Sequence, residues 1–346
     1  MYIKDHNLTD RNNRAILERV ERYWSIDMHQ REHTAIIARE HSLVEQVERV
    51  RLQANKHIDE HQRAALGQYM TPAAIARLMA SMLTCDTAHV SLLDAGAGIG
   101  SLLSAVVEQL SMRSIRPESI HITAYEIDTQ LKPYLEETLQ RCVHAARNVG
   151  MTCSYELIQA DFITDIVEQL TNPLFIAQPK SYTCAIVNPP YRKIQTNSVT
   201  RKNLRRAGIE TSNLYTAFLA LVMQVLRPGG ELVAITPRSF CNGPYFRPFR
   251  EKMLQTVSLQ RFHLFNTRRD TFQDDDVLQE TVIFSAIKSS IQAPIVDLTT
   301  SDRPDDVFLC FVLSHLSSLY IPRMQNALFI WLRIYLESRL QSKFRV

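Results

Sequence analysis

Short apolar runs alternate with longer amphipathic segments through the middle of the chain. Runs rich in Val, Ile and Leu and bounded by polar residues are typical of strands buried in a parallel sheet. Seven such strands are predicted, at residues 90–94, 120–125, 155–159, 184–187, 231–236, 259–265 and 281–286. The intervening segments predict helices, most clearly at 214–222. This alternation predicts an α/β fold.

The two ends of the chain differ from this central part. Residues 1–62 are charged and helix-forming, and apolar side chains recur at helical spacing in two stripes, within residues 16–24 and 43–50. We expect two helices here that pack on the central domain or on a partner. Residues 63–290 form the expected central domain. Residues 291–346 form a short C-terminal tail whose apolar runs look helical or frayed.

A glycine-rich loop follows the first predicted strand. Asp94 ends this strand, and Gly96, Gly98 and Gly100 lead into a helix. Glycines let the backbone of a loop approach a ligand closely at the N-terminus of a helix. The GxGxG spacing differs from the dinucleotide fingerprint, and the Lys-Ser/Thr pair of a phosphate loop is missing, so ATP is disfavoured. A tight turn without a ligand is the alternative interpretation.

Acidic residues stand at the ends of the next two strands. Glu126 ends the second strand, where a carboxylate can accept hydrogen bonds from both hydroxyls of a ribose. Asp161 follows the third strand, where it can accept the amine of an adenine, and Phe162 can pack on the face of that ring. Each acid has an alternative role as a helix cap or a solvated loop residue. Their recurrence at successive strand ends favours a nucleoside-binding site.

The tetrapeptide Asn188-Pro189-Pro190-Tyr191 directly follows the apolar strand at 184–187. Ligands bind at the carboxyl edge of open α/β sheets, where this tetrapeptide is expected to lie. The amide oxygen of Asn188 and the carbonyl of Pro189 can accept both N–H groups of an exocyclic amine, and the prolines restrict the backbone. Tyr191 can stack on the ring that bears the amine. The alternative is an ordinary strand-ending turn.

With these motifs the chain resembles the S-adenosylmethionine-dependent DNA methyltransferases that act on amino groups. More narrowly, it resembles the gamma-class N6-adenine methylases of restriction-modification systems, in which the cofactor motifs precede the catalytic motif. Residues 67–72 are similar to the first cofactor motif of the family, although Met70 replaces a more usual aromatic residue. Residues 240–246 and 271–280 are similar to later catalytic segments. The resemblance covers about residues 60–290.

The resemblance implies a Rossmann-like, seven-stranded methyltransferase sheet with helices on both faces and an antiparallel last strand beside the fifth. It implies S-adenosylmethionine as the cofactor and no metal. The implied cofactor-binding residues are Tyr69, Thr71, Pro72, Asp94, Gly96, Gly98, Gly100, Glu126, Asp161 and Phe162. The implied catalytic residues are Asn188, Pro189, Pro190, Tyr191 and Phe272, of which Phe272 would cover another side of the target adenine.

Charge is distributed unevenly along the chain. The net charge is only +3, which by itself does not indicate a nucleic-acid partner. The segment after Tyr191, however, holds six basic residues and no acidic one up to residue 206. We expect a loop here that contacts the phosphates of double-stranded DNA. The expected DNA-binding residues are Arg192, Lys193, Arg201, Lys202, Arg205 and Arg206.

Several other classes of protein are disfavoured by composition. The six cysteines show no CxxC pairing, so neither a zinc site nor a disulfide framework is indicated. The N-terminus is polar, unlike a signal peptide, and no uncharged run reaches the roughly 18–20 apolar residues of a membrane span. A cytoplasmic location is expected, without a membrane partner. The resemblance adds a cognate restriction endonuclease in the same system, without a stable complex.

Several alternatives remain open on the sequence. A protein glutamine methyltransferase also uses Asn-Pro-Pro-Tyr, RNA base methylation is a weaker alternative, and the tetrapeptide does not exclude cytosine N4. The tail is short for the DNA-reading region of gamma-class relatives. It is therefore expected to be a truncated or frame-altered remnant of a target-recognition region. A non-catalytic protein that binds the cofactor is the alternative from a different class.

Overall fold

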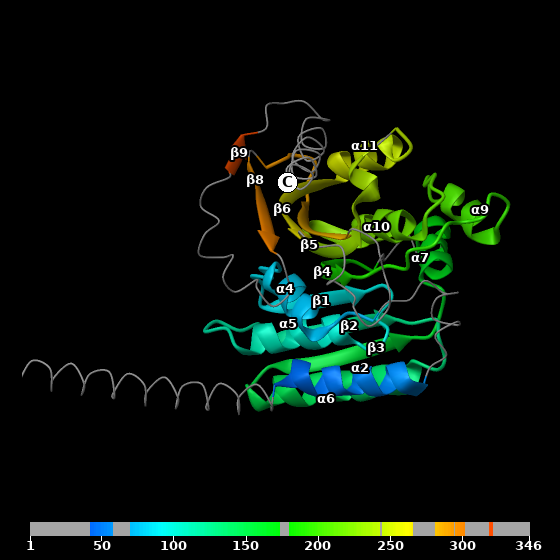
Figure 1. Cartoon of the computed structure of the whole chain (residues 1–346). Helices are drawn as coiled ribbons and strands as arrows, with labels where there is room; N and C mark the ends of the chain where they lie inside the picture. The colour runs from blue at the N-terminus through cyan, green and yellow to red at the C-terminus, as the bar shows by residue number, and fades with distance from the viewer. Residues whose placement is uncertain are drawn as a thin grey trace, which may run out of the picture.

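The computed structural model describes residues 42–57, 70–173, 180–242, 244–265, 281–293, 295–301 and 318–320. The strands form one nine-stranded sheet in the order β3-β2-β1-β4-β5-β7-β6-β8-β9 (Figure 1). They are β1 (His89–Asp94), β2 (Ser119–Tyr125), β3 (Thr152–Ile158), β4 (Tyr182–Val187), β5 (Leu226–Pro237), β6 (Val257–Phe265), β7 (Thr281–Lys288), β8 (Ile295–Ser301) and β9 (Ser318–Tyr320). The first five strands of this order run parallel, and β7 lies antiparallel between β5 and β6.

Helices cover both faces of the sheet (Figure 1). One face carries α2 (Leu43–His57), α4 (Ala73–Ser81), α5 (Ser101–Ser111) and α6 (Lys132–Asn148). The other face carries α7 (Phe162–Thr171), α9 (Val199–Arg206), α10 (Leu214–Val225) and α11 (Arg247–Thr256). A short 3-10 helix, η1 (Arg238–Cys241), follows β5. This three-layer arrangement is the α/β fold predicted from the alternating pattern.

Strand β4 explains why the central strands are apolar throughout. Cys184 and Ile186 are buried in the core beneath α4 and α5, whereas Ala185 and Val187 are buried in the core beneath α7 and α10. Successive side chains of a strand point to opposite faces, so a strand covered on both faces needs an uninterrupted apolar run. The strand therefore ends where the polar Asn188 begins, at an edge that the helices leave open.

All seven predicted strands are present, and the antiparallel last strand lies beside the fifth as expected. The predicted count of seven was nevertheless too low. The additional strands β8 and β9 fall in the segment that was assigned to the tail, and β8 pairs parallel with β6. The apolar runs predicted farther along the tail, at 308–313 and 328–332, lie outside the described residues.

The structure also changes the expectation for the basic segment after the tetrapeptide. Residues 199–206 form helix α9 instead of a loop, and the hydroxyl of Ser198 accepts a hydrogen bond from the Arg201 N–H as the N-terminal cap. The buried Leu204 anchors this helix to the core that α7 and α10 share. Few apolar residues occur in α9, so the sequence carried only a weak helical pattern.

Helix α2 confirms the second predicted N-terminal stripe. Leu43, Val44, Val47 and Val50 are buried against the central domain. The first stripe, at residues 16–24, lies outside the described residues. Within the described part of the chain, every helix is too short or too polar to span a membrane.

Candidate active site

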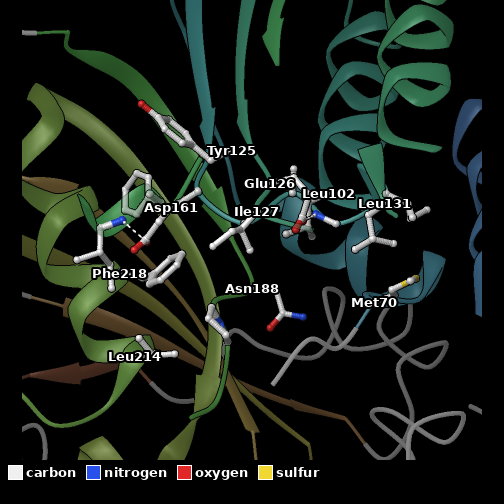
Figure 2. A pocket seen from close by; sticks show the side chains of 18 of the residues that line it. Met70, Leu102, Tyr125, Glu126, Ile127, Leu131, Asp161, Asn188, Leu214 and Phe218 are labelled. Atoms are coloured by element: carbon white, nitrogen blue, oxygen red, sulfur yellow. Dashed lines mark hydrogen bonds between the residues drawn. The ribbon is translucent and has the colours of Figure 1, made fainter. Parts of the chain in front are cut away.

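The carboxyl ends of β1, β2 and β4 surround a cavity of about 290 Å³. In Figure 2 the side chains of Glu126, Ile127 and Asn188 lie around the same open space. The cavity brings together many of the predicted site residues. Those on its wall are Thr71, Gly96, Gly98, Glu126, Asp161, Phe162, Asn188, Pro190 and Arg192. Tyr69 and Phe272 lie outside the described residues.

The glycine loop has two positions that require glycine. Gly98 and Gly100 have φ angles of +57° and +87°, which L side chains rarely adopt. A Cβ added at Gly100 would also lie 2.8 Å from Cγ2 of Thr138 on α6. Gly100 therefore allows close helix packing, although it does not line the cavity. Gly98 lines the cavity, and its N–H donates to Oε2 of Glu126 at 2.8 Å.

Glu126 is nearly buried, with 4% of its surface exposed, and both carboxylate oxygens have backbone partners. Besides Gly98, the N–H of Asp128 donates to Oε1 at 2.8 Å. Burial raises the pKa of Glu126 to about 7, and nearby Asp128 contributes. The carboxylate thus holds the glycine loop and stands on the cavity wall. Its role toward a ribose stays a prediction.

Asp94 lies beneath the loop instead of on the wall. It is fully buried, and Oδ1 accepts the N–H of Gly96 at 3.3 Å. Within the described residues, Oδ2 is buried without a hydrogen-bond partner. Burial raises the pKa of Asp94 to about 8, and the charge of Glu126 adds to the shift. Two buried acids therefore stand beside one cavity, an environment that would stabilise a positively charged ligand.

Asp161 and Phe162 are also built into the fold. Oδ1 of Asp161 caps α7 by accepting the N–H of Ile163 at 3.0 Å, and Oδ2 accepts the hydroxyl of Thr164 at 2.9 Å. The helix cap that was the alternative for this acid is therefore present. Phe162 is only 2% exposed, and its ring lies 5.1 Å from that of Phe218. Contacts of Asp161 and Phe162 with an adenine stay predictions.

Much of the apolar part of the cavity wall was not predicted from the sequence. Beside the predicted Phe162 and Met70 of the first motif, it includes Leu102, Ile127, Leu131 and Phe218. Ile127 gives the clearest signal in hindsight, because it directly follows the predicted acid Glu126 and remains 54% exposed beside the cavity. Phe218 carries no such signal, because it is one of many apolar residues on α10. Together these side chains can hold the faces of a planar ring.

The Asn188 amide is held at both ends. Its Nδ2 donates to the hydroxyl of Thr71 at 3.1 Å, and its Oδ1 accepts the Tyr191 hydroxyl at 2.9 Å. The Tyr191 hydroxyl also lies 3.2 Å from the carbonyl oxygen of Ile235. An amide oxygen has two lone pairs, so acceptance of the Tyr191 hydroxyl does not by itself use the full capacity of Oδ1. Pro72, next to Thr71, is the N-terminal cap residue of α4 and does not line the cavity.

A second cavity, of about 790 Å³, lies on the Tyr191 side of the tetrapeptide. Arg192 lines both cavities, so they adjoin at this residue. Aromatic rings form one wall, with centroids 6.4 Å apart for Tyr191 and Tyr215 and 5.9 Å apart for Tyr215 and Phe246. The remaining lining residues are mostly polar or basic: Lys193, Asn213, Pro237, Arg238, Ser239, Asn242 and Tyr245. Tyr191, Arg192 and Lys193 are predicted site residues, and Asn242, Tyr245 and Phe246 belong to the segment 240–246 that resembles a later catalytic segment. The other lining residues were not predicted, because they meet the tetrapeptide only in the fold.

The predicted DNA-binding residues fall into two groups. Arg192 and Lys193 line the second cavity, whereas the other four lie on α9. Arg201 and Arg205 both form ion pairs with Glu210, and Arg206 pairs with Glu168 at 3.1 Å. Hydrogen bonds from Arg205 and Arg201 lower the pKa of Glu210 to about 2. Glu210, which follows α9 in the sequence, and Glu168, which lies on α7, thus offset part of the positive charge of α9.

The architecture and the sequence both match methyltransferases. Residues 108–272 match the Eco57I restriction-modification methylase family. The chain is 42% identical over 261 residues to the Type II methyltransferase M.PstI of Providencia stuartii, covering 75% of this chain and 50% of that protein. It is 42% identical over 264 residues to M.BsuBI of Bacillus subtilis, covering 75% and 51%.

Solved structures agree on the fold. A putative class I S-adenosylmethionine-dependent methyltransferase from Listeria monocytogenes is similar, with a TM-score of 0.56 and 17% identity, over 78% of this chain and 76% of that one. This likeness confirms the predicted Rossmann-like methyltransferase fold.

Over most of its length the chain is thus similar in sequence to restriction-modification methylases. The family and the fold together imply S-adenosylmethionine as the cofactor. The chain spans about half the length of the curated relatives that it matches.

Proposed function

We propose that this chain transfers a methyl group from S-adenosylmethionine to the N6 amine of adenine in DNA, as the modification component of a restriction-modification system. The observation that carries the proposal is the position of the tetrapeptide between two cavities. Asn188 and Pro190 line the first cavity, and Tyr191 lines the second. A group bound on one side therefore meets a group bound on the other side at the Asn188 amide.

The residues of the first cavity fit the cofactor. Glu126 offers carboxylate oxygens to ribose hydroxyls, and the apolar wall formed by Ile127 and Phe218 suits an adenine ring. The buried acids Asp94 and Glu126 suit the positive charge of a sulfonium group. When bound, S-adenosylmethionine supplies this sulfonium methyl group, and its S–C bond breaks as the new N–C bond forms.

The residues of the second cavity fit a base taken out of the duplex. The target amine cannot reach a protein pocket inside double-stranded DNA, so the nucleotide must be flipped out. Tyr191 would stack on the base, with Tyr215 and Phe246 completing the aromatic wall. Arg192 and Lys193, which line the same cavity, would hold the adjoining phosphates.

The Asn188 amide then acts on the target amine. Its Oδ1 and the Pro189 carbonyl would accept the two N6 hydrogens and aim the nitrogen lone pair at the methyl group. Rate enhancement comes from this positioning and from acceptance of the positive charge that develops on nitrogen. After transfer the methylated amine releases its extra proton to water. A cognate restriction endonuclease in the same system, acting without a stable complex, is part of this proposal.

The test uses tritiated S-adenosylmethionine and mixed duplex DNA, followed by digestion and nucleoside analysis. We expect the label in N6-methyl-2′-deoxyadenosine, and none when Asn188→Ala is used as the control. Label in N4-methyl-2′-deoxycytidine, or label that appears only when RNA or protein is supplied as the acceptor in a parallel reaction, would contradict the proposal and identify the alternative. Absence of transfer to any of these acceptors, with the cofactor bound, would indicate a non-catalytic protein.

A further inference from the structure

Thr71 approaches the catalytic amide from a distant part of the sequence. Its hydroxyl accepts a hydrogen bond from Nδ2 of Asn188 at 3.1 Å across 117 positions of the chain. The side chain is only 5% exposed, so few water molecules can take its place. The resemblance had assigned Thr71 to the cofactor, and that assignment gave no reason to expect contact with Asn188.

The conformation of the Thr71 backbone is restricted. The residue precedes Pro72, and a residue before proline is largely restricted to extended conformations. Pro72 has φ −63° and ψ 154° and leads into α4. The N–H of Ala73, the first residue of α4, donates to Oε2 of Glu48 on α2 at 3.1 Å. Helix α2 thus helps to hold the segment that presents the Thr71 hydroxyl.

At the Oδ1 end of the amide, the partner is the Tyr191 hydroxyl, which can donate to either of two acceptors. The Tyr191 hydroxyl lies 2.9 Å from Oδ1 of Asn188 and 3.2 Å from the carbonyl oxygen of Ile235, but it has only one proton to donate. When an amine donates to Oδ1, this proton can turn to Ile235. Thr71, by contrast, contacts the Nδ2 end and can keep its bond throughout. The χ2 angle of an asparagine is otherwise broadly distributed.

We propose that Thr71 is a positioning residue for methyl transfer: its hydroxyl sets the plane of the Asn188 amide, so that Oδ1 meets the amine of the target base. This inference rests on the proposed function of Asn188. The hydrogen bond connects Thr71, beside the cofactor cavity, to Asn188, the group that acts on the substrate.

The test compares Thr71→Val, which keeps the shape of the side chain but loses the hydroxyl, with Thr71→Ser, which keeps the hydroxyl. We expect Thr71→Val to lower kcat for DNA by about ten- to a hundredfold, the effect of a misplaced catalytic group. Its KM for DNA and its Kd for S-adenosylmethionine should change little. Thr71→Ser should restore most of kcat.

A control variant separates positioning from general loss of stability. Thr183 lies at the other end of β4, where its hydroxyl accepts the N–H of Ser91 at 2.8 Å and donates to the Ser91 carbonyl at 3.0 Å. Thr183→Val therefore removes a threonine hydroxyl from the strand that carries Asn188, and kcat should stay near that of the wild type. Equal kcat values for Thr71→Val and the wild type, or for Thr71→Val and Thr71→Ser, would overturn the proposal. So would a loss found wholly in the Kd for the cofactor.

A second measurement does not depend on activity. In chain labelled with ¹⁵N at asparagine, the side-chain NH₂ signals of Asn188 can be assigned by their loss in Asn188→Ala. These signals should shift in Thr71→Val and stay close to their wild-type positions in Thr71→Ser and Thr183→Val. Unmoved signals in Thr71→Val would overturn the positioning role even if the wild type transferred no methyl group. Failure of methyl transfer with shifted signals would count against the proposed function alone.

Discussion

Replacing Glu126 by alanine removes a carboxylate that serves both the glycine loop and the cofactor cavity. In the wild type, Oε2 accepts the N–H of Gly98 at 2.8 Å, and Oε1 accepts the N–H of Asp128 at 2.8 Å. The same oxygens are the proposed acceptors of the ribose hydroxyls. The variant should therefore bind S-adenosylmethionine more weakly.

The expected magnitude follows from the hydrogen bonds that are lost. Leaving hydroxyls without acceptors in a buried site costs about 1–3 kcal/mol, and each 1.4 kcal/mol changes Kd about tenfold. We therefore expect a roughly five- to 150-fold increase in Kd for Glu126→Ala, measured by titration calorimetry. Glu136 is exposed on α6, so Glu136→Ala is a matched control that should bind as the wild type does. Equal affinities for Glu126→Ala and the wild type would refute the ribose assignment.

The pH dependence gives the same assignment a second test. Burial raises the pKa of Glu126 to about 7 in the free protein. Hydrogen bonds from ribose hydroxyls favour the charged form and lower this pKa in the complex. Below pH 7 binding must therefore release a proton, so affinity should rise with pH by at most about tenfold per unit and level off above 7.

The variant Glu126→Gln isolates this effect because its side chain does not titrate. The difference between the wild-type and Glu126→Gln curves removes the titration of the ligand's own amine. If log affinity changes with pH in the same way for the wild type and Glu126→Gln between pH 6 and 8, Glu126 does not change its protonation on binding.

Three further predictions concern the catalytic amide, the basic helix and the glycine loop. Asn188→Ala should keep cofactor binding and lose methyl transfer; loss of binding in calorimetry would instead make Asn188 structural. Glu210→Gln should free two arginines and steepen the slope of log K for DNA against log salt, and removal of the α9 cations should flatten it by about 0.9 per lost phosphate contact. Those cations are Arg201, Lys202, Arg205 and Arg206. Gly100→Ala should destabilise the protein by about 1–3 kcal/mol in denaturant unfolding, because its Cβ would meet Thr138. Gly150→Ala, with φ +82° and open space around it, should show backbone strain alone, and an equal loss in both variants would contradict the packing argument.

The sequence predicted the elements whose burial leaves a simple pattern. The strand at 184–187 is apolar throughout because both its faces are covered, and the same holds for most of the predicted strands. Strand β8 escaped prediction because its place in the sheet depends partly on polar contacts. His263 on β6 contacts the hydroxyls of Thr299 and Ser301 at 2.9 and 3.1 Å. Such polar positions do not stand out in a search for apolar runs.

The candidate site was predictable only in part, for a similar reason. The motifs placed Glu126 and Asn188 at the carboxyl ends of β2 and β4, and these ends meet at one edge of the parallel sheet. The contact between Thr71 and Asn188 depends on how α2 and α4 pack, and no local pattern records it. The ion pairs of Glu210 likewise depend on the path of the chain after α9.

The two cavities differ in charge in the way that their proposed ligands require. The first has Glu126 and Asp161 on its wall, with Asp94 bonded to Gly96 of the same wall. The pKa values of Asp94 and Glu126 are raised by burial and by neighbouring carboxylates, so a cationic ligand would relieve an unfavourable charge there.

The second cavity is lined by Lys193 and Arg238, together with Arg192, which it shares with the first, and these charges favour a polyanion. A sulfonium cofactor and DNA would thus be drawn to opposite sides of the tetrapeptide. Asn188 stands between them with an uncharged amide. A carboxylate in its place would bind the amine as well, but the acids of the first cavity would raise its pKa and favour the protonated form, which can accept less readily. A neutral amide does not titrate, so it stays an acceptor whatever the charges of its neighbours.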